Sequence, residues 1–523
     1  MLGDGRWWVV SLQMFSTALA VYSTRLRAPF VADDHFIFYR LQQGGAFGFA
    51  TAPPTSFFRP LISLQYYLDY LLWGLNPLAS HFVNLGWHWL CGMLVWRLAL
   101  ALLTHGGWRA RSAHRAAAFA GVLFVVLPAN VEAVAWFAAR ADMVATAGAL
   151  GALLLLMRFQ QGGSRLAYAG ALACFTVGLF CKESLLTFPL MAWLWLRHLG
   201  VAQAGRLTLP FWGVMAVYWA LRTLAVQGLG AYPDAWATLQ RPWLLGVNLL
   251  AYLFQMGMPA ILYGLGRDRW DTLFWSVWLV GAGLMVWRWR RAPHAGIRYT
   301  HGSLLLGWTL LALLPVLIFK PSPLYFLNSR YSYLASAFVA VGASALLAIL
   351  TRSLRGEAPS LARWGRLAAA CLLAAYFGGA LRQVDAWRVA GEIARSSVAS
   401  LRDAPVETTL VLLSVPDHFH GAYIWRAGFH EGVAVLLPER ARQPMYALSR
   451  FTMRLRADGR VQYADGVATL DSPDDIFLPP EGVRTPPGDE PMVLPDKLVI
   501  PMTVLRQGAV LGYEADRFRV VAP

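Results

Sequence analysis

Long apolar runs fill the first three quarters of the chain. From Arg6 to about Leu381, stretches of roughly 15 to 20 apolar residues recur, and each is bounded by Arg, Pro or Gly. A helix needs about 20 residues to cross a bilayer, so the pattern predicts an α-helical polytopic membrane protein with about eleven spans. One further run, Trp243 to Leu262, is interrupted by Gly-Met-Pro and is predicted to be a re-entrant segment that returns to the side it entered from.

The pattern changes after Leu381, where Pro, Asp and Arg return at ordinary density and short alternations replace the long runs. We therefore predict a transmembrane domain at residues 1–385, with a first outer loop at 25–80. A small soluble α/β or β-rich domain is predicted at 386–523. In this second domain the stretch RADGRVQYADGVATL predicts a β-hairpin with an Asp-Gly turn.

Composition and charge support a membrane protein and argue against a nucleic-acid partner. Of the 523 residues 57% are hydrophobic and 14% are charged, below the roughly 25% charged residues of soluble domains. The net charge is +16, but the arginines lie mostly between apolar runs, which indicates membrane topology. Basic clusters occur at Arg97–Arg115, Arg158–Arg165, Arg197–Arg206, Arg288–Arg298 and Arg352–Arg366. Loops with these clusters are predicted to be cytoplasmic, which places the C-terminal domain in the periplasm of a multi-pass inner-membrane protein.

Ionisable residues interrupt the apolar pattern near the ends of runs on the predicted outer side. Two adjacent aspartates, Asp33 and Asp34, follow the first run, which we expect to remain as a helix because a cleaved signal peptide would leave them at a frayed terminus. The others are Glu132, Arg140, Asp142, Lys182, Glu183 and Arg330. Such groups cost roughly 3 kcal/mol or more at membrane depth unless they are paired or hydrated. They predict one outward-facing functional cleft, and an ion-pair lattice that ties loops together is the alternative.

Carboxylates opposed by cations at a membrane surface suit sugar transfer from a lipid carrier. One carboxylate, for which we favour Asp33, would deprotonate an acceptor hydroxyl as general base, and the cations would stabilise the departing lipid phosphate. The expected partners are a polyprenyl-phosphate sugar, membrane lipid, and an acceptor that is a protein Ser or Thr, a glycan or a lipid. No cofactor is assigned from the sequence, and a divalent cation, Mg²⁺ or Mn²⁺, is left open.

Six ordered motifs carry a resemblance to a known family. They are DDHFIF at 33–38, FFRPLISLQYYLDYLLWGLNPLASHFVNLGWH at 57–88, LPANVEAVAWFAARADMVA at 127–145, CKESLLTFPL at 181–190, NSRYSYLAS at 328–336 and AWRVAGEIA at 386–394. In this order they are similar to motifs of the multispanning GT-C glycosyltransferases, most closely the transmembrane O-mannosyltransferases that carry tetratricopeptide repeats and their bacterial relatives. The family's His-Thr before the glutamate is replaced by Asn130 and Val131, and residues 396–523 lack the 34-residue helical repeat period.

The resemblance implies a GT-C fold and an inverting hexosyltransferase, with roles for particular residues. Asp33 and Asp34 would be catalytic. The residues that would bind the donor or its phosphate are Arg59, Glu132, Arg140, Asp142, Lys182, Glu183, Arg330 and Tyr331. The supporting residues would be His35, His81, Asn84 and His88. The last three lie on one helix face at spacings of three and four residues, for which packing against a neighbouring helix is favoured over metal ligation.

Other interpretations stay open at the level of sequence. A transferase of the same class could use a lipid pyrophosphate donor for an oligosaccharide or a cell-surface glycan. A transporter or flippase would favour internal repeats and acids at mid-span, which the sequence does not display. A membrane scaffold whose outer domain binds partners is the third alternative. In the C-terminal domain, Asp417, His418, His420, His430 and Glu431 form a candidate metal cluster.

Overall fold

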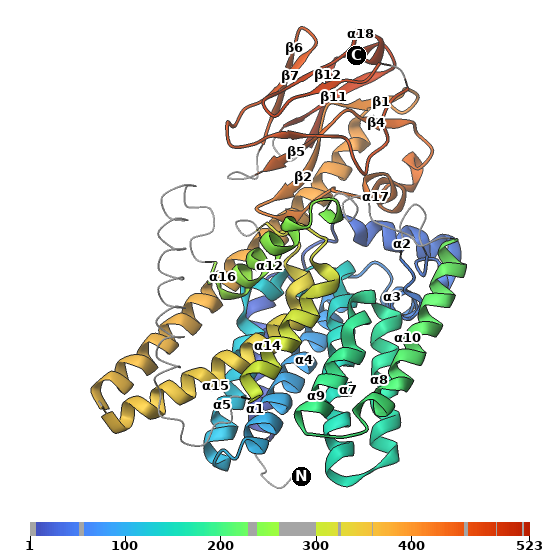
Figure 1. Ribbon diagram of the computed structural model, residues 1–523. Coiled ribbons are helices and arrows are strands. Elements are labelled where there is room, and N and C mark those ends of the chain that lie inside the picture. The colour runs from blue at the N-terminus through green and yellow to red at the C-terminus, as the bar shows by residue number, and fades with distance from the viewer. Residues whose placement is uncertain are drawn as a thin grey trace.

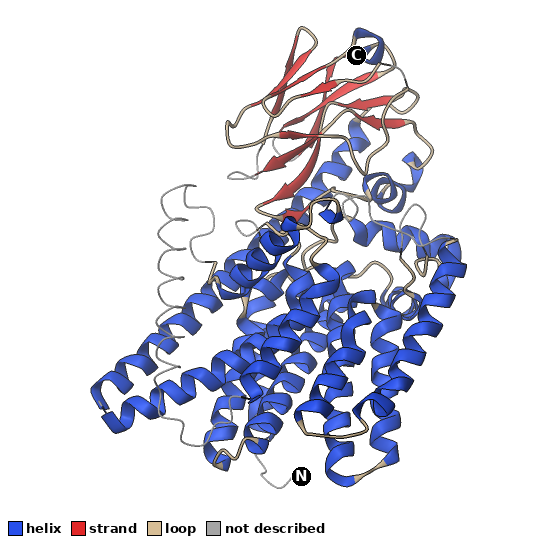
Figure 2. Cartoon of the chain, viewed as in Figure 1, coloured by secondary structure: helices blue, strands red, loops and turns tan. Residues whose placement is uncertain are grey.

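A bundle of long helices carries a β-rich domain at one end (Figures 1 and 2). The computed structural model describes residues 7–51, 57–227, 238–260, 300–322, 326–357, 359–453, 459–487, 489–514 and 517–522. Within these residues five helices are long and apolar enough to cross a membrane, a bent pair makes a sixth, and four shorter apolar helices accompany them. The predicted class, a multi-pass helical membrane protein with a small C-terminal β-rich domain, is confirmed. The number of eleven spans stays a prediction.

The helices of the membrane part follow the apolar runs. They are α1 (Trp7–Tyr22), α2 (Asp33–Gly44), α3 (Pro60–Trp73), α4 (Pro77–His105), α5 (Ala110–Val126), α6 (Val131–Ala135), α7 (Arg140–Gly162), α8 (Arg165–Cys181), α9 (Phe188–His198), α10 (Ala204–Val226), α12 (Trp243–Gly257), α14 (Thr300–Leu313), α15 (Tyr333–Glu357) and α16 (Pro359–Ser400). Glycines allow close packing, because a Cβ at Gly148 of α7 would lie 2.7 Å from the Cys174 carbonyl oxygen of α8. The apolar pattern therefore determines both the helices and their tight contacts.

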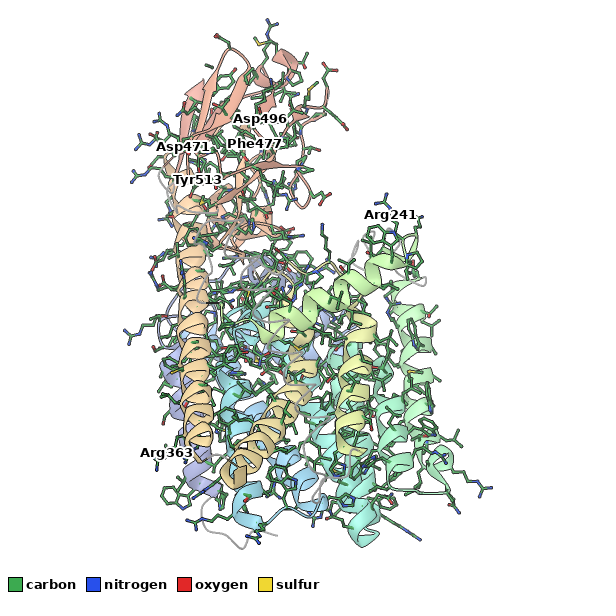
Figure 3. The ribbon with its side chains drawn as sticks, turned by 60° about the vertical axis from the view of Figure 1, so that its left-hand side comes forward. Arg241, Arg363, Asp471, Phe477, Asp496 and Tyr513 are labelled. Carbon is green, nitrogen blue, oxygen red and sulfur yellow. The ribbon has the colours of Figure 1, made fainter. Side chains whose placement is uncertain are left out.

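The basic loops lie at the end of the bundle away from the β-rich domain. The connections α4–α5, α7–α8, α9–α10 and α15–α16 are all at this end, together with the start of the described chain (Figure 1). Arg363, near the start of α16, is visible there, at the opposite end from Asp471, which follows β7, and from Tyr513 of β11 (Figure 3). This arrangement matches the predicted alternation of the loops. The basic cluster at 288–298 lies outside the described residues.

Three short breaks in the helices lie at the end that faces the β-rich domain. Leu127 is extended before Pro128, as a residue before proline tends to be, so α5 and α6 meet at a bend of 55°. Lys182 is extended between α8 and the 3₁₀ turn η4 (Glu183–Thr187). Asn328 is left-handed just before the 3₁₀ turn η6 (Ser329–Ser332). Each break places an ionisable side chain at this end of the bundle: Glu132 and Lys182, which are buried, and Arg330, which is half-buried.

The predicted re-entrant run begins as α12, which slants across the bundle end next to the β-rich domain (Figures 1 and 3). The helix ends at Gly257, and Met258 is extended before Pro259, so the Gly-Met-Pro break acts as the sequence indicates. The end of the run, residues 261 and 262, lies outside the described residues, so its return to the same side stays a prediction.

The C-terminal domain contains three four-stranded sheets. Its strands are β1 (Leu410–Leu412), β2 (Val415–Phe419), β3 (Ala422–Tyr423), β4 (Met445–Ala447), β5 (Arg450–Met453), β6 (Val461–Ala464), β7 (Val467–Leu470), β8 (Phe477–Leu478), β9 (Met492–Val493), β10 (Lys497–Val499), β11 (Ala509–Glu514) and β12 (Arg517–Ala522), with helices α17 (Phe429–Leu436) and α18 (Met502–Leu505). The sheet orders are β12-β11-β1-β4, β3-β2-β5-β8 and β6-β7-β10-β9. The predicted hairpin is confirmed as β6–β7, whose turn residues Asp465 and Gly466 both have positive φ.

The C-terminal domain docks on α2 and α16. The predicted domain boundary at residue 386 falls inside α16, which continues to Ser400 and carries the chain from the bundle into the domain. The amide of Ala32 donates to the Ile424 carbonyl at 2.9 Å, and the indole nitrogen of Trp425 donates to Ser397 Oγ at 2.8 Å. The His35 and Trp425 rings lie 5.0 Å apart. The two domains thus meet through backbone and ring contacts at the start of α2.

The contact between the C-terminal domain and the start of α2 can be tested at Gly428. Gly428 has φ +74°, and a Cβ there would lie 2.7 Å from the Ala32 carbonyl oxygen. We expect Gly428→Ala to lower the free energy of unfolding by about 1 to 3 kcal/mol, because strain and clash add. Thermal unfolding and the rate of proteolysis between the domains would measure this. Gly213→Ala, in open space within α10, serves as the control, and equal effects of the two substitutions would contradict the docking contact.

Candidate functional site

The paired aspartates begin α2, but their surroundings differ. Asp34 is fully buried, and its carboxylate accepts hydrogen bonds from the Val31 amide at 3.0 Å and the Ala138 amide at 2.9 Å. Burial raises the pKa of Asp34 to about 7, although these amides and Arg25 oppose the rise. Asp34 therefore holds the start of α2 against the turn before α7. Its hydrogen bonds fix the position of this segment.

Asp33 is half-buried, and in the described part of the chain its carboxylate has no hydrogen bond or ion pair. Burial raises its pKa, Arg330, Arg426 and Arg59 lower it, and Glu431 raises it further. A carboxylate with free lone pairs and a raised pKa can accept a proton from a hydroxyl group. Of the two aspartates, Asp33 has the geometry of a base.

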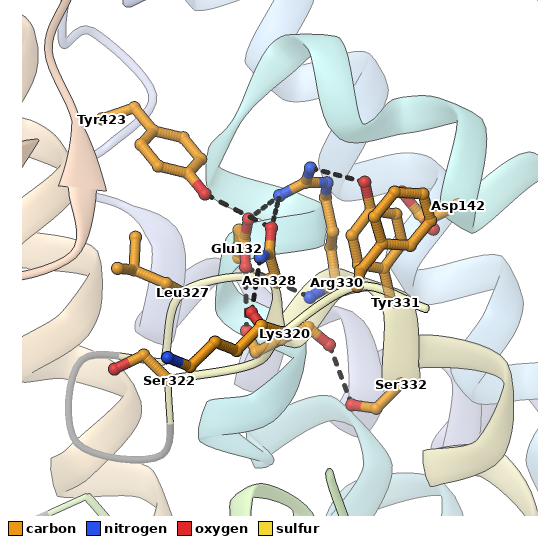
Figure 4. A network of polar contacts seen from close by, with 12 residues as sticks. Glu132, Asp142, Lys320, Ser322, Leu327, Asn328, Arg330, Tyr331, Ser332 and Tyr423 are labelled. Atoms are coloured by element: carbon orange, nitrogen blue, oxygen red, sulfur yellow. Dashed lines mark hydrogen bonds and ion pairs between the residues drawn. The ribbon is translucent and has the colours of Figure 1, made fainter. Parts of the chain in front are cut away.

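Three ion pairs connect the breaks in the helices. Arg330 pairs with Glu132, and Ser329 Oγ and the Arg330 amide also donate to Glu132 at 3.2 Å (Figure 4). Lys182 Nζ lies 2.5 Å from Asp142, and burial lowers the lysine pKa to about 8 although Asp142 raises it. These contacts bring the α6–α7 segment, Lys182 just before η4, and η6 to one place from three distant parts of the sequence.

The third pair is between Arg59 and Glu183. Arg59 Nε and Nη2 donate to the two carboxylate oxygens of Glu183 at 2.8 and 2.6 Å, which is a bidentate arrangement. Burial raises the pKa of Glu183, but the guanidinium outweighs this effect and lowers it to about 2. Glu183 is therefore ionised, and its charge balances that of Arg59.

Tyr331 links two of the pairs. Its ring lies 4.8 Å from Lys182 Nζ and 4.3 Å from the Arg330 guanidinium, and its hydroxyl accepts from Arg330 at 3.0 Å. Arg330 also stacks over Trp136 at 4.9 Å. Cation–π contacts of this kind hold the positive charges in place without neutralising them. The predicted residues Arg59, Glu132, Asp142, Lys182, Glu183, Arg330 and Tyr331 thus form one polar cluster near Asp33.

Arg140 makes a separate, fully buried structure. Its Nη2 lies 2.6 Å from Asp69, and its Nε donates to Asn84 Oδ1 at 2.6 Å. The Phe137 ring lies 4.8 Å from its guanidinium. Arg140 therefore braces α3, α4 and α7 instead of joining the three pairs. Sequence reasoning missed Asp69, although an acid in the middle of the apolar stretch LQYYLDYLL was a visible signal.

The supporting residues contact neighbouring elements of the fold. His88 contacts the Tyr333 hydroxyl at 2.7 Å and the Val125 carbonyl at 3.1 Å, and His81 lies 3.4 Å from the Leu26 carbonyl. Asn84 donates to the Val134 and Trp136 carbonyls, which close the bend that holds Glu132. His35 packs on Trp425 instead of facing the polar cluster. His81, Asn84 and His88 thus contact neighbouring segments, as expected for a helix face that packs against its surroundings.

Residues of the C-terminal domain approach the same cluster, although no motif in the sequence indicates this. Tyr423 Oη lies 3.5 Å from Asn328 Oδ1 (Figure 4). The Tyr423 and Trp136 rings lie 5.0 Å apart. Arg426 and Glu431 act electrostatically on Asp33. Because almost 400 residues separate them from Asp33, only tertiary structure reveals the connection.

The candidate metal cluster of the C-terminal domain has other partners. Asp417 pairs with Arg450, and His430 Nε2 lies 3.0 Å from the Met445 carbonyl. Among the described residues no group of three or more His, Cys, Asp or Glu side chains could hold a metal ion. At the membrane surface the carboxylates of Glu132, Asp142 and Glu183 are each taken by a cation. The residues described do not fit a metal site, and no step proposed below passes through one.

Sequence comparison finds relatives that are named as protein O-mannosyl-transferases. No family model matches the chain. Over 137 residues, 25% of this chain, it is 35% identical to protein O-mannosyl-transferase Tmtc1 of Drosophila melanogaster, and over 89 residues, 17% of the chain, it is 36% identical to protein O-mannosyl-transferase TMTC2 of Mus musculus. The matched segments span only 15% and 10% of those relatives. The resemblance to transmembrane O-mannosyltransferases is confirmed over this part of the chain.

Solved structures of ArnT from Cupriavidus metallidurans are also similar to this chain. One is in the apo state, with 15% identity and a TM-score of 0.45, and the other is bound to undecaprenyl phosphate, with 14% identity and a TM-score of 0.42. Each covers 84% of this chain, which in turn covers 85% and 86% of those chains.

The buried Arg140 pair gives a prediction about stability. Asp69→Asn removes the carboxylate and leaves a fully buried guanidinium without its counter-charge, so we expect the free energy of unfolding to fall by about 3 to 5 kcal/mol. Unfolding in detergent micelles, followed by circular dichroism, would measure this. Asp385→Asn is the matched control, because its partner Arg388 is one-third exposed and the expected loss is under about 1 kcal/mol. Similar losses in the two variants would contradict a special role for the buried pair.

Proposed function

We propose that this protein is a membrane glycosyltransferase that moves a hexose from a polyprenyl-phosphate donor to an acceptor hydroxyl, at the outer face of the inner membrane. The observation that carries the proposal is the half-buried carboxylate of Asp33, which lacks a partner in the described chain beside a cluster of paired cations. The similarity to proteins named O-mannosyl-transferases supports the same reaction class.

The position of the cluster suits a lipid donor. The breaks that carry Glu132, Lys182 and Arg330 lie at the end of apolar helices, beneath a polar domain. A polyprenyl chain would lie among or beside the helices, and its phosphate would reach the bundle end where these cations are held. The acceptor would arrive from the aqueous side, next to the C-terminal domain. Donor and acceptor would therefore meet at the start of α2.

The chemistry is a single displacement. Asp33 would take the proton from the acceptor hydroxyl, whose oxygen attacks the anomeric carbon while the bond between that carbon and the phosphate oxygen breaks. The electron pair of the broken bond leaves with the polyprenyl phosphate, and Arg330, Lys182 and Arg59 would stabilise its charge. One displacement inverts the anomeric centre. Asp34 would act indirectly, because its hydrogen bonds to Val31 and Ala138 hold Asp33 in position.

A donor panel tests this function. Purified protein would be incubated with polyprenyl-phosphate and polyprenyl-pyrophosphate sugars and membrane extract as acceptor source, and donor consumption followed by mass spectrometry. We expect one monophosphate donor to be consumed. Asp33→Asn should slow its use by about 10² to 10⁴ without lowering thermal stability, because only a free carboxylate is lost. Asp34→Asn should lower stability as well, since an amide nitrogen cannot accept a hydrogen bond.

The control is Asp385→Asn, an exposed aspartate of α16 that should leave both activity and stability unchanged. If no donor is consumed, or if Asp33→Asn retains wild-type activity, the proposed transferase mechanism is wrong. A donor that is consumed only as the pyrophosphate would move the protein to the related class that transfers glycans from such carriers.

The pH profile gives a second test. The rate should rise with pH as Asp33 loses its proton, in a range above the ordinary carboxyl pKa because burial raises this value. It should fall again near pH 8, where Lys182, whose pKa burial lowers to about 8, loses its positive charge. Lys182→Arg keeps a charge throughout, so the alkaline fall should disappear while the acidic limb stays. An unchanged alkaline limb in this variant would exclude Lys182 as its source.

A further inference from the structure

The loop between β3 and α17 is held over the start of α2. On one side the Ile424 carbonyl accepts from the Ala32 amide, and on the other Trp425 donates to Ser397. Gly428 approaches the Ala32 carbonyl so closely that a Cβ would clash. Trp425 and Gly428 are thus both held in place, and Arg426, which lies between them in the sequence, has a defined position beside the polar cluster.

Arg426 differs from the other cations of the cluster. Its side chain is exposed, and its guanidinium lies 5.3 Å from the centre of the Tyr423 ring. It interacts electrostatically with Asp33 and Arg330, so it belongs to the same site. In the described part of the chain no carboxylate lies within ion-pair distance of it. Asp417, an acid of the same domain that acts electrostatically on Arg426, is already paired with Arg450.

The balance of charge around Asp33 indicates what an arginine without an ion-pair partner could do. The cations that act on Asp33 are Arg330, Arg426 and Arg59. Arg330 is neutralised by Glu132 and Arg59 by Glu183, while Lys182 is neutralised by Asp142. An anion that enters beside Asp33 therefore meets paired charges from the membrane domain, and Arg426 supplies a positive charge that has no ion-pair partner among the described residues. A guanidinium with five free donors suits the oxygens of a phosphate.

We propose that Arg426 of the C-terminal domain binds the phosphate of the lipid-linked donor, so that the site is completed by both domains. This inference rests on the proposed function. Tyr423 would position Arg426, because its ring lies under the guanidinium and its hydroxyl contacts Asn328. The ligand class is a phosphate at a membrane surface, either the single phosphate of a polyprenyl monophosphate or one of the two in a pyrophosphate.

Binding of the two lipids measures the contribution of Arg426. Full-length protein in nanodiscs would be titrated with polyprenyl monophosphate and with polyprenyl pyrophosphate, for the wild type, Arg426→Gln and Arg426→Lys. We expect Arg426→Gln to weaken binding of the monophosphate about tenfold or more, because a charge-assisted hydrogen bond is lost. Arg426→Lys should recover part of the loss, and Arg426→Gln should reduce the dependence of binding on salt.

The matched control is Arg442→Gln, an exposed arginine of the same domain, which should bind as the wild type does. Wild-type binding by Arg426→Gln, with unchanged salt dependence, would overturn the inference and leave the proposed function intact. A loss confined to the pyrophosphate would support the phosphate contact but contradict the monophosphate donor. If the wild type binds neither lipid, the proposed function itself fails.

Kinetics separate this contact from a structural role. Arg426→Gln should raise the KM for the donor and leave the KM for the acceptor unchanged, with thermal stability equal to that of Arg442→Gln. A higher acceptor KM with an unchanged donor KM would place Arg426 on the acceptor and overturn the inference. Loss of stability would be checked with Arg426→Lys, which keeps the stem and charge of the side chain.

Discussion

The requirement that charge at the end of an apolar bundle be paired determines most of this structure. Arg330, Lys182, Arg59 and Arg140 each hold an acid from another element, and the pairs connect helices that are far apart in sequence. Removing one member of a buried pair costs more than the pair contributes, so such pairs constrain the fold strongly. Charge that stays unpaired against this background is informative, and within the described chain the site has such a carboxylate in Asp33.

Interruptions of the helices make these pairs feasible. A side chain in the middle of a span would have to be buried in the bilayer or against another helix, whereas the bend at Pro128 and the extended Lys182 place their neighbours at the bundle end. The left-handed Asn328 does the same for Arg330, and its side chain accepts from that guanidinium at 3.3 Å. The polar cluster is thus built on short irregular segments that long packed helices hold in place.

Sequence reasoning reached the class of the fold and most members of the cluster. The apolar runs predicted the helices, and acids or cations at their ends predicted Glu132, Lys182 and Arg330 as neighbours. The pattern could not assign partners, because pairing depends on how helices turn about their axes. It placed Arg140 with the other ionisable residues, but that residue makes a separate buried pair with Asp69. Asp69 lies in an apolar stretch, so the sequence pattern does not mark it as part of a site. Its burial is explained only by its ion pair with Arg140.

The role of the C-terminal domain could not be read from the sequence, because the contacts that matter are between backbones. Ala32 has φ 44° and ψ −124°, a sparsely populated conformation that costs a non-glycine residue roughly 1 to 3 kcal/mol, and its amide is held by the Ile424 carbonyl. The next two residues are the aspartates. A segment in this conformation persists only where its surroundings determine it, and here those surroundings include the C-terminal domain. Undocking the domain would release Ala32 and, with it, the start of α2 that directs Asp33 outward and Asp34 inward. The C-terminal domain is therefore a structural part of the site, and the carboxylates owe their different environments to its contact as much as to the helices of the bundle.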